Sequence, residues 1–213
     1  MKLKIDHSDI LNGIWSLIMG KVSFLISSVI ACTLMLHFNN YILGTLLSGV
    51  IGGLLLGAFH FRQKMIGRMA IAGMIATPIG MLGVFVLLEG LAYGLEFLIP
   101  SFAESLDNAG LSDVIAIILM GAAAGAVFGA LVYGRKSVLL FSASCAAVSI
   151  VSGFMVRALN LGYGIKAWLE RVFQIFGQID LNFVTIHSGL GLGLGLGIGL
   201  YTIAMRRREG SAA

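Results

Sequence analysis

Residues 189–199 read GLGLGLGLGIG, and the basic run Arg206-Arg207-Arg208 follows shortly afterwards. In a helix surrounded by water, each of the six glycines would cost about 1 kcal/mol relative to alanine. In a lipid bilayer the backbone has no water to bond to, so the helix persists and the glycines form a surface that other helices approach closely. A lone β-strand of the same sequence would leave backbone groups unpaired in lipid. The stretch therefore predicts a closely packed membrane-spanning helix.

The composition extends this prediction to the whole chain. Of 213 residues, 58% are hydrophobic and 11% are charged, and the mean hydropathy is +0.98. Soluble domains carry about 25% charged residues, so a soluble domain with a single anchor is excluded. The net charge of +4 comes from basic residues at the ends of apolar runs, which argues against a nucleic-acid partner. Cys32 and Cys145 lie in apolar stretches and predict neither a disulfide framework nor a zinc site.

Six apolar segments come close to the roughly 20 residues that a spanning helix needs. They are Val22–Leu36, Tyr41–Phe59, Met69–Leu88, Val114–Val132, Ser137–Val156 and Phe183–Met205. The predicted fold class is therefore all-α, a polytopic membrane protein of six transmembrane helices in one integral domain over residues 1–213. Thr77-Pro78 predicts a kink in the third span, because proline removes a backbone donor there.

Two amphipathic helices are predicted outside the spans. Apolar residues from Ile10 to Ile18 follow helical spacing opposite Asp9 and Asn12, so we expect an N-terminal helix lying on the membrane surface. Between spans five and six, the apolar residues of Ile165–Ile179 follow the same spacing and predict a helix in the outer interface. A shorter external counterpart begins at Leu95 and is interrupted by Pro100.

Basic residues give the orientation. With both termini in the cytoplasm, 11 of the 14 basic residues lie inside, and only Arg157, Lys166 and Arg171 lie outside. Most acidic residues show the opposite bias. The positive-inside rule then predicts an integral protein of a bacterial cytoplasmic (inner) membrane, with cytoplasmic N- and C-termini.

Glycines recur at four-residue spacing on three even-numbered spans, a pattern typical of glycine zippers. These helix-packing residues are Gly49, Gly53, Gly57, Gly121, Gly125, Gly129, Gly189, Gly193 and Gly197. Each series precedes an aromatic residue and a basic cap, which favours three hairpin repeats over residues 21–65, 66–136 and 137–208. Independent convergence of membrane helices on small residues is the alternative. The last span also carries a second glycine stripe on its other side, which suits a helix surrounded by neighbours.

Polar chemistry is sparse inside the predicted spans. No charged residue or histidine falls near the middle of a span, which counts against a transporter with a midplane carboxylate. Mid-depth polarity is limited to Cys32, Thr33, Thr77, Ser144, Cys145 and Ser149.

Ionisable residues gather instead at the predicted outer rim, where Glu89, Arg157, Asp180, His187 and His37 form a candidate polar site. Glu89 and Arg157 fall at similar depth and predict an ion pair, or alternatively a site for a lipid head group or anion. His37 and His187 are a candidate pair of haem ligands, and His187 with Asp180 is a candidate base acting on lipid. No other cofactor, no metal site and no catalytic residue is predicted.

Three functions follow in order of preference. The first is a non-enzymatic inner-membrane protein that acts through close helix packing, with membrane lipids and with copies of itself or other membrane subunits as partners. The second is a small transporter or channel for an apolar or neutral solute. The third is an enzyme acting on lipid at the outer leaflet.

Overall fold

The computed structural model describes residues 7–60, 63–83, 111–173 and 179–210, with the single positions 86, 90, 94 and 97. Six helical segments among them are long and apolar enough to cross a membrane, which agrees with a multi-pass membrane protein. The elements are α1 (His7–Phe38), α2 (Tyr41–Phe59), α3 (Gln63–Pro78), the π-helical η1 (Ile79–Gly83), α6 (Leu111–Tyr133), η2 (Arg135–Ser137), α7 (Val138–Leu161), α8 (Tyr163–Phe173) and α9 (Leu181–Gly210).

Most predicted spans coincide with these helices, and α2 has the predicted bounds. The predicted kink at Thr77-Pro78 corresponds to a change from α-helix to π-helix directly after Pro78. The predicted external helix Ile165–Ile179 is present as α8, while 174–178 lie outside the described residues. The predicted Leu95–Pro100 segment also lies outside them, apart from the exposed Phe97.

The first helix differs from the expectation of a separate N-terminal surface helix. α1 runs without a break through 32 residues, about 48 Å, so it exceeds the roughly 30 Å of the hydrocarbon core. One face of its N-terminal half packs on α9, where the buried Ser16 and Gly20 lie against Gly195 and Gly191, while Leu11, Ile14 and Trp15 on the other side are exposed. Because this half has a helix to pack on, it continues the span instead of turning onto the membrane surface.

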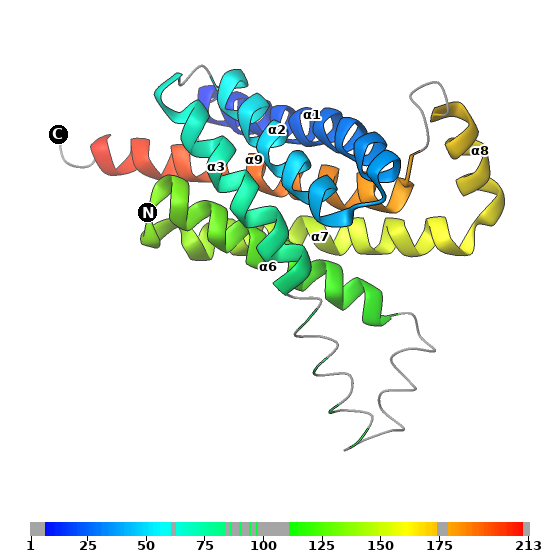
Figure 1. The fold of residues 1–213 in the computed structure, drawn as a ribbon. Coiled ribbons are helices and arrows are strands. Elements are labelled where there is room, and N and C mark those ends of the chain that lie inside the picture. The colour runs from blue at the N-terminus through cyan, green and yellow to red at the C-terminus, as the bar shows by residue number, and fades with distance from the viewer. Residues whose placement is uncertain are drawn as a thin grey trace.

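The six long helices form a closed ring. Contacts join α1 to α2, α2 to α3, α3 to α6, α6 to α7, α7 to α9, and α9 back to α1. Figure 1 shows α9 passing between α1 and α7, while α8 lies outside the bundle beyond the end of α7. The helix with the Gly-Leu run is thus enclosed by its neighbours, and it is the most buried of the six.

Neighbouring helices run antiparallel around the ring. Gly44 lies against Met35 and Gly52 against Phe24, so α1 and α2 run in opposite directions, and the other adjacent pairs show the same reversal. We call the end where α1 begins and α9 finishes the basic end, since the helix ends that carry Arg68, Arg135, Lys136, Arg206 and Arg207 lie there. The opposite end, where α1 finishes and α9 begins, is called the distal end.

The glycine stripes are the contact surfaces within this ring. Glycines of α2 lie against backbone atoms of α3, and glycines of α6 lie against α7. The two stripes of α9 separate, because Gly189, Gly193 and Gly197 face α7 while Gly191, Gly195 and Gly199 face α1. A side chain at most of these positions would overlap the backbone or a tightly packed side chain of the neighbouring helix.

Large apolar side chains point both inward and outward. The core cluster joins all six helices and includes Phe24, Leu56, Phe128, Phe141 and Leu194. On α1, serines and small residues are buried, whereas Leu25, Ile26 and Ile30 are exposed. An apolar exterior over a partly polar interior suits a helix bundle surrounded by lipid, where exposed apolar residues carry no penalty.

Candidate functional site

The inner face of α9 carries a histidine. Leu190, Leu194 and Ile198 belong to the core cluster and so define the face of α9 that points into the ring. His187 lies seven residues before Leu194, which is two helical turns along the same face. His187 is only 1% exposed. The structure thus places it in the interior of the ring, where Phe183 separates it from the distal end.

The hydrogen bonding of His187 leaves one ring nitrogen unused. Nδ1 lies 2.8 Å from the carbonyl oxygen of Phe183, and the two rings are 3.9 Å apart between centroids. A carbonyl only accepts, so Nδ1 carries the hydrogen. Nε2 is buried and has no hydrogen-bond partner among the described residues. In the neutral ring Nε2 is therefore a free acceptor.

Helix register shows which residues share the height of His187. On α9, His187 lies between Asp180, whose N–H points to Cys32 Sγ at 3.0 Å, and Gly191, which packs on Phe24. The matching stretch of α1, between Phe24 and Cys32, contains the buried Ser27 and Ser28. On α2, Ser48 is midway between the two glycines that contact Phe24 and Met35 of α1. Ser28, Ser48 and His187 therefore lie at about the same height, within one helical turn of each other.

Two further helices contribute at the same height. Thr77 of α3 donates to the carbonyl oxygen of Thr45 at 2.9 Å and lies against Gly49. Thr45 and Gly49 lie on either side of Ser48 along α2, so Thr77 is close to the height of Ser48. Ser152 of α7 lies against Gly189, two residues from His187. We call the resulting set, drawn from five of the six ring helices, the polar belt; its members are Ser28, Ser48, Thr77, Ser152 and His187. All of them are buried.

The polar belt has acceptors to spare. Ser28 donates to Leu25 O at 2.9 Å, Thr77 to carbonyls of α3 and α2, and Ser152 to Val148 O at 3.4 Å. Their hydroxyl hydrogens are used, while their oxygen lone pairs remain. Ser48 Oγ, like His187 Nε2, is buried without a hydrogen-bond partner among the described residues. The belt is thus an uncharged, acceptor-rich site close to the middle of α2.

Aromatic side chains of α6, α7 and α9 lie between the polar belt and the basic end. Phe128 and Phe141 are fully buried, with ring centroids 6.2 Å apart. Tyr133 stacks on Phe141 at 5.1 Å and approaches Tyr201 at 4.6 Å. The aromatic stack therefore separates the belt from the basic end in this conformation.

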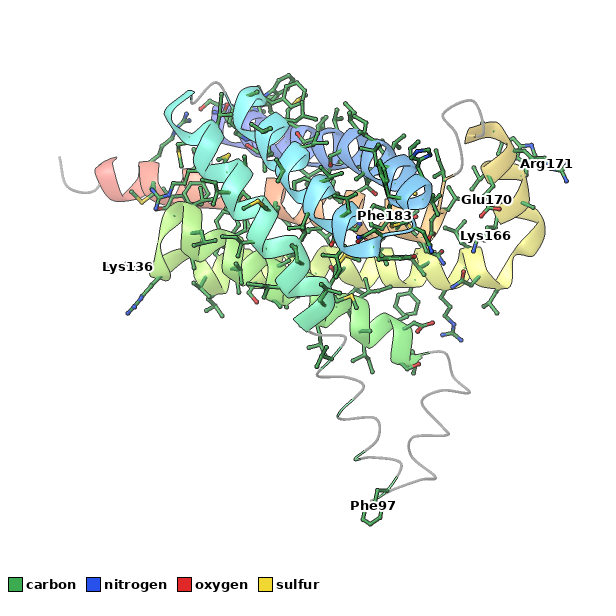
Figure 2. The ribbon with its side chains drawn as sticks, in the orientation of Figure 1. Phe97, Lys136, Lys166, Glu170, Arg171 and Phe183 are labelled. Carbon is green, nitrogen blue, oxygen red and sulfur yellow. The ribbon has the colours of Figure 1, made fainter. Side chains whose placement is uncertain are left out.

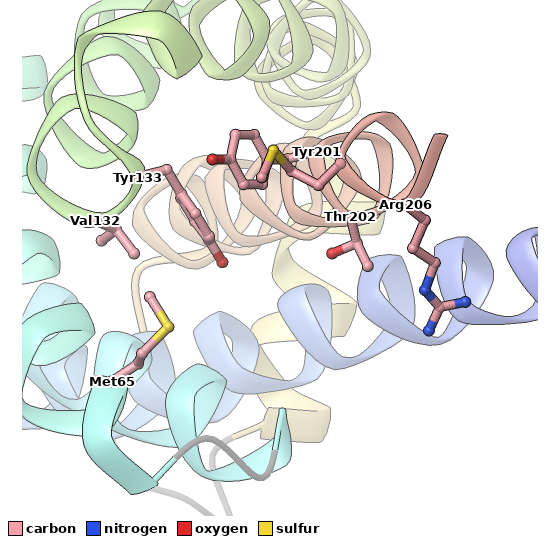
Figure 3. A pocket seen from close by; sticks show the side chains of 7 residues that line it. Met65, Val132, Tyr133, Tyr201, Thr202 and Arg206 are labelled. Atoms are coloured by element: carbon pink, nitrogen blue, oxygen red, sulfur yellow. The ribbon is translucent and has the colours of Figure 1, made fainter. Parts of the chain in front are cut away.

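A pocket of about 480 Å³ opens on the basic-end side of this stack. Figure 3 shows its walls, which come from α3, α6 and α9, helices on different sides of the ring. They are Met65, Val132, Tyr133, Tyr201, Thr202, Met205 and Arg206. Arg206 points towards α1 and pairs with Asp9 at 3.3 Å, so its charge is partnered. We call this pocket, which lies at the basic end between α3, α6 and α9, the vestibule.

The distal rim is occupied by structural contacts. Asp180 caps α9 by accepting the N–H groups of Asn182 and Phe183, at 2.9 and 3.2 Å. Its other oxygen accepts from the hydroxyl of Tyr41 at 3.0 Å. Figure 2 shows Phe183 inside this end of the bundle and Lys136 pointing away from the opposite end.

The predicted rim residues are thus distributed over different environments. Asp180 caps α9 at the rim, His187 lies in the interior, and His37 is exposed at the end of α1, where its ring meets Phe38 edge-on. Arg157 is half-buried on α7, and Glu89 lies outside the described residues, so their predicted ion pair does too. No group of three potential metal-binding side chains occurs in the described part of the chain.

Sequence reasoning missed Ser28, Ser48 and Ser152. A signal was present, since serines and small residues occupy a single face of the first span, among large apolar residues. A serine on one helix does not reveal its height relative to other helices, and only the packing brings these five side chains to one height. Comparison with protein-family models, curated proteins and solved structures yields no match to this chain.

Proposed function

We propose that this chain is a multi-pass membrane protein that binds a small solute at the polar belt and conducts it across the membrane, as a small transporter or channel. The observation that carries this proposal is the pair of unpaired buried atoms, His187 Nε2 and Ser48 Oγ, within a ring of apolar helices. An unpaired buried polar group destabilises a protein by about 1–3 kcal/mol. An ionisable residue inside a membrane bundle is a functional candidate by default.

The glycine stripes support a self-contained bundle. In the sequence they favoured an oligomer or a subunit of a larger complex, but their contacts are with helices of the same chain. They therefore give no separate reason to expect a partner. The lipid-acting enzyme receives less support, because Phe183 separates His187 from the distal end and Asp180 is engaged as a cap.

The topology proposed for this function has the basic end in the cytoplasm and three successive hairpins around the ring. The charge asymmetry supports the orientation. The hairpin repeat is supported by three matching contacts: Gly49 of α2 packs on α3, Gly125 of α6 packs on α7, and Gly195 of α9 packs on α1. In each case an even-numbered span contacts the next odd-numbered span around the ring. On this view, Gly191, Gly195 and Gly199 are the counterparts of the other two glycine series.

Water access to Ser48 tests the proposed function. Cys32→Ala and Cys145→Ala remove the two native thiols, both of which are buried. In that background, Ser48→Cys is treated with a charged, membrane-impermeant thiol reagent in sealed vesicles of both orientations. A conducting protein must expose the polar belt to water, so slow labelling is expected from at least one side.

Two control variants give the labelling expected for a lipid-facing position and for a water-exposed position. Leu54→Cys, on the exposed apolar face of α2, should stay unlabelled because it faces lipid. Asn40→Cys, exposed at the distal end, should react quickly from the outer side, and labelling from the cytoplasmic side would reverse the proposed orientation. Complete protection of Ser48→Cys while Asn40→Cys reacts would refute conduction through the ring.

A further inference from the structure

We infer that the polar belt selects a small, uncharged solute that donates at least one hydrogen bond and carries a second polar group, the chemistry of a short polyol or a urea-like amide. This inference rests on the proposed function and names its solute class. It follows from what the five belt side chains have left to offer once their own bonds are made.

The polar belt offers a ligand more hydrogen-bond acceptors than donors. The Nδ1 hydrogen of His187 is directed to Phe183 O, and the hydroxyl hydrogens of Ser28, Thr77 and Ser152 are directed to backbone carbonyls. What remains is the lone pair of His187 Nε2, the oxygens of the hydroxyl groups, and the hydroxyl of Ser48, which can donate as well as accept. A ligand pairs with His187 Nε2 only by donating a hydrogen, and a molecule that only accepts leaves this nitrogen unpaired.

The absence of charged residues from the polar belt argues for a neutral solute. None of the five belt residues is a carboxylate, lysine or arginine, so an ion would be buried there without a counter-charge, at high cost in free energy. Asp180 lies two helical turns from His187, towards the distal end. One of its carboxylate oxygens caps α9, and the other accepts the hydrogen bond from Tyr41. At the vestibule, the charge of Arg206 is already partnered by Asp9.

The packing around the belt argues for a small solute. Ser28, Ser48, Thr77 and His187 are each at most 1% exposed, and the aromatic stack lies between them and the vestibule. The two unpaired atoms come from α2 and α9, so a single molecule that pairs with both needs a donor for His187 Nε2 and a second polar group, donor or acceptor, for Ser48 Oγ. Adjacent hydroxyl groups or an –NH₂ pair meet this requirement.

Osmotic flux into proteoliposomes tests the solute class. Purified protein is reconstituted, and stopped-flow light scattering follows vesicle reswelling in gradients of glycerol, urea or glycine betaine. Glycerol and urea are uncharged and carry donors, whereas betaine is a somewhat larger zwitterion and carries none. We expect protein-dependent entry of glycerol or urea and no entry of betaine above protein-free vesicles.

Point variants connect the flux to the belt. Ser48→Ala should slow entry about five- to tenfold, the effect of losing one hydrogen bond to the solute. Ser188→Ala is the matched control, because that hydroxyl bonds Thr185 O on its own helix. His187→Gln, which keeps an acceptor, should retain more flux than His187→Leu; the folded yield of each variant is checked by size-exclusion chromatography.

The outcomes separate this inference from the proposed function. If Ser48→Cys is labelled by water-soluble reagent while betaine enters and neither glycerol nor urea does, the function stands and the solute class is wrong. Equal flux in the Ser48→Ala and Ser188→Ala variants would remove the belt from the pathway. If no probe enters and Ser48→Cys is protected, both proposals fail.

Discussion

Gly195 shows what a single residue decides in this ring. A Cβ built on it would overlap the carbonyl oxygen of Ser16 and lie 2.9 Å from Leu17 Cα, both on α1. Backbone atoms cannot move aside as a flexible side chain can. At Gly67 of α3, by contrast, nothing lies within 4 Å of such a Cβ. Replacing each of these two glycines with alanine therefore distinguishes the effect of close packing on stability from the effect of helix propensity.

Gly195→Ala should lower the free energy of unfolding by about 1–3 kcal/mol, because it forces α1 and α9 apart. Gly67→Ala should leave it unchanged or raise it by up to about 1 kcal/mol through helix propensity. The measurement is the thermal midpoint in mild detergent, followed by intrinsic fluorescence. Similar midpoints for the two variants would show that α1 and α9 do not meet at Gly195.

At the scale of an element, the start of α9 is fixed by Asp180. This carboxylate caps the helix and accepts from Tyr41 of α2, so it sets both where α9 begins and which helix lies beside it. The helices themselves followed from the sequence, as the bounds of α2 illustrate. The length of α1 did not follow, since its N-terminal half forms part of the bundle only because α9 offers a glycine face to it.

A double-mutant cycle tests the contact between Asp180 of α9 and Tyr41 of α2. Asp180→Ala should destabilise the protein by about 1–2 kcal/mol through the lost cap, and Tyr41→Phe by about 0.5–1.5 kcal/mol through the lost hydrogen bond. Because the two side chains bond each other, the double variant should lose less than the sum. Thr202→Val, near the other end of α9, should be additive with Asp180→Ala. If the effects of Tyr41→Phe and Asp180→Ala were also additive, the hydrogen bond between these two side chains would contribute nothing to stability.

At the scale of the whole molecule, the contact between α1 and α9 closes the ring and joins residues from the two ends of the chain. Cysteines at Gly13 and Gly199 test it, since a Cβ on Gly199 would lie 3.0 Å from Gly13 Cα. In the background without native thiols, mild oxidation should cross-link this pair within one chain. Non-reducing electrophoresis after reconstitution should show a faster monomer band. Ile14→Cys with Gly199→Cys is the control, as Ile14 is half exposed. A cross-linked dimer would place the contact between two copies.

The sequence by itself determined the class of this protein and its helices. Long apolar runs form helices in lipid whatever their neighbours, because the backbone must bond internally. His187, Asp180 and Thr77 were also visible as unusual residues. Only the tertiary structure decided that α9 is enclosed between α1 and α7, and that Ser28, Ser48, Thr77, Ser152 and His187 share one height. The physical reason is that height and facing depend on how one helix slides and turns against another, and close contacts between distant glycines set both.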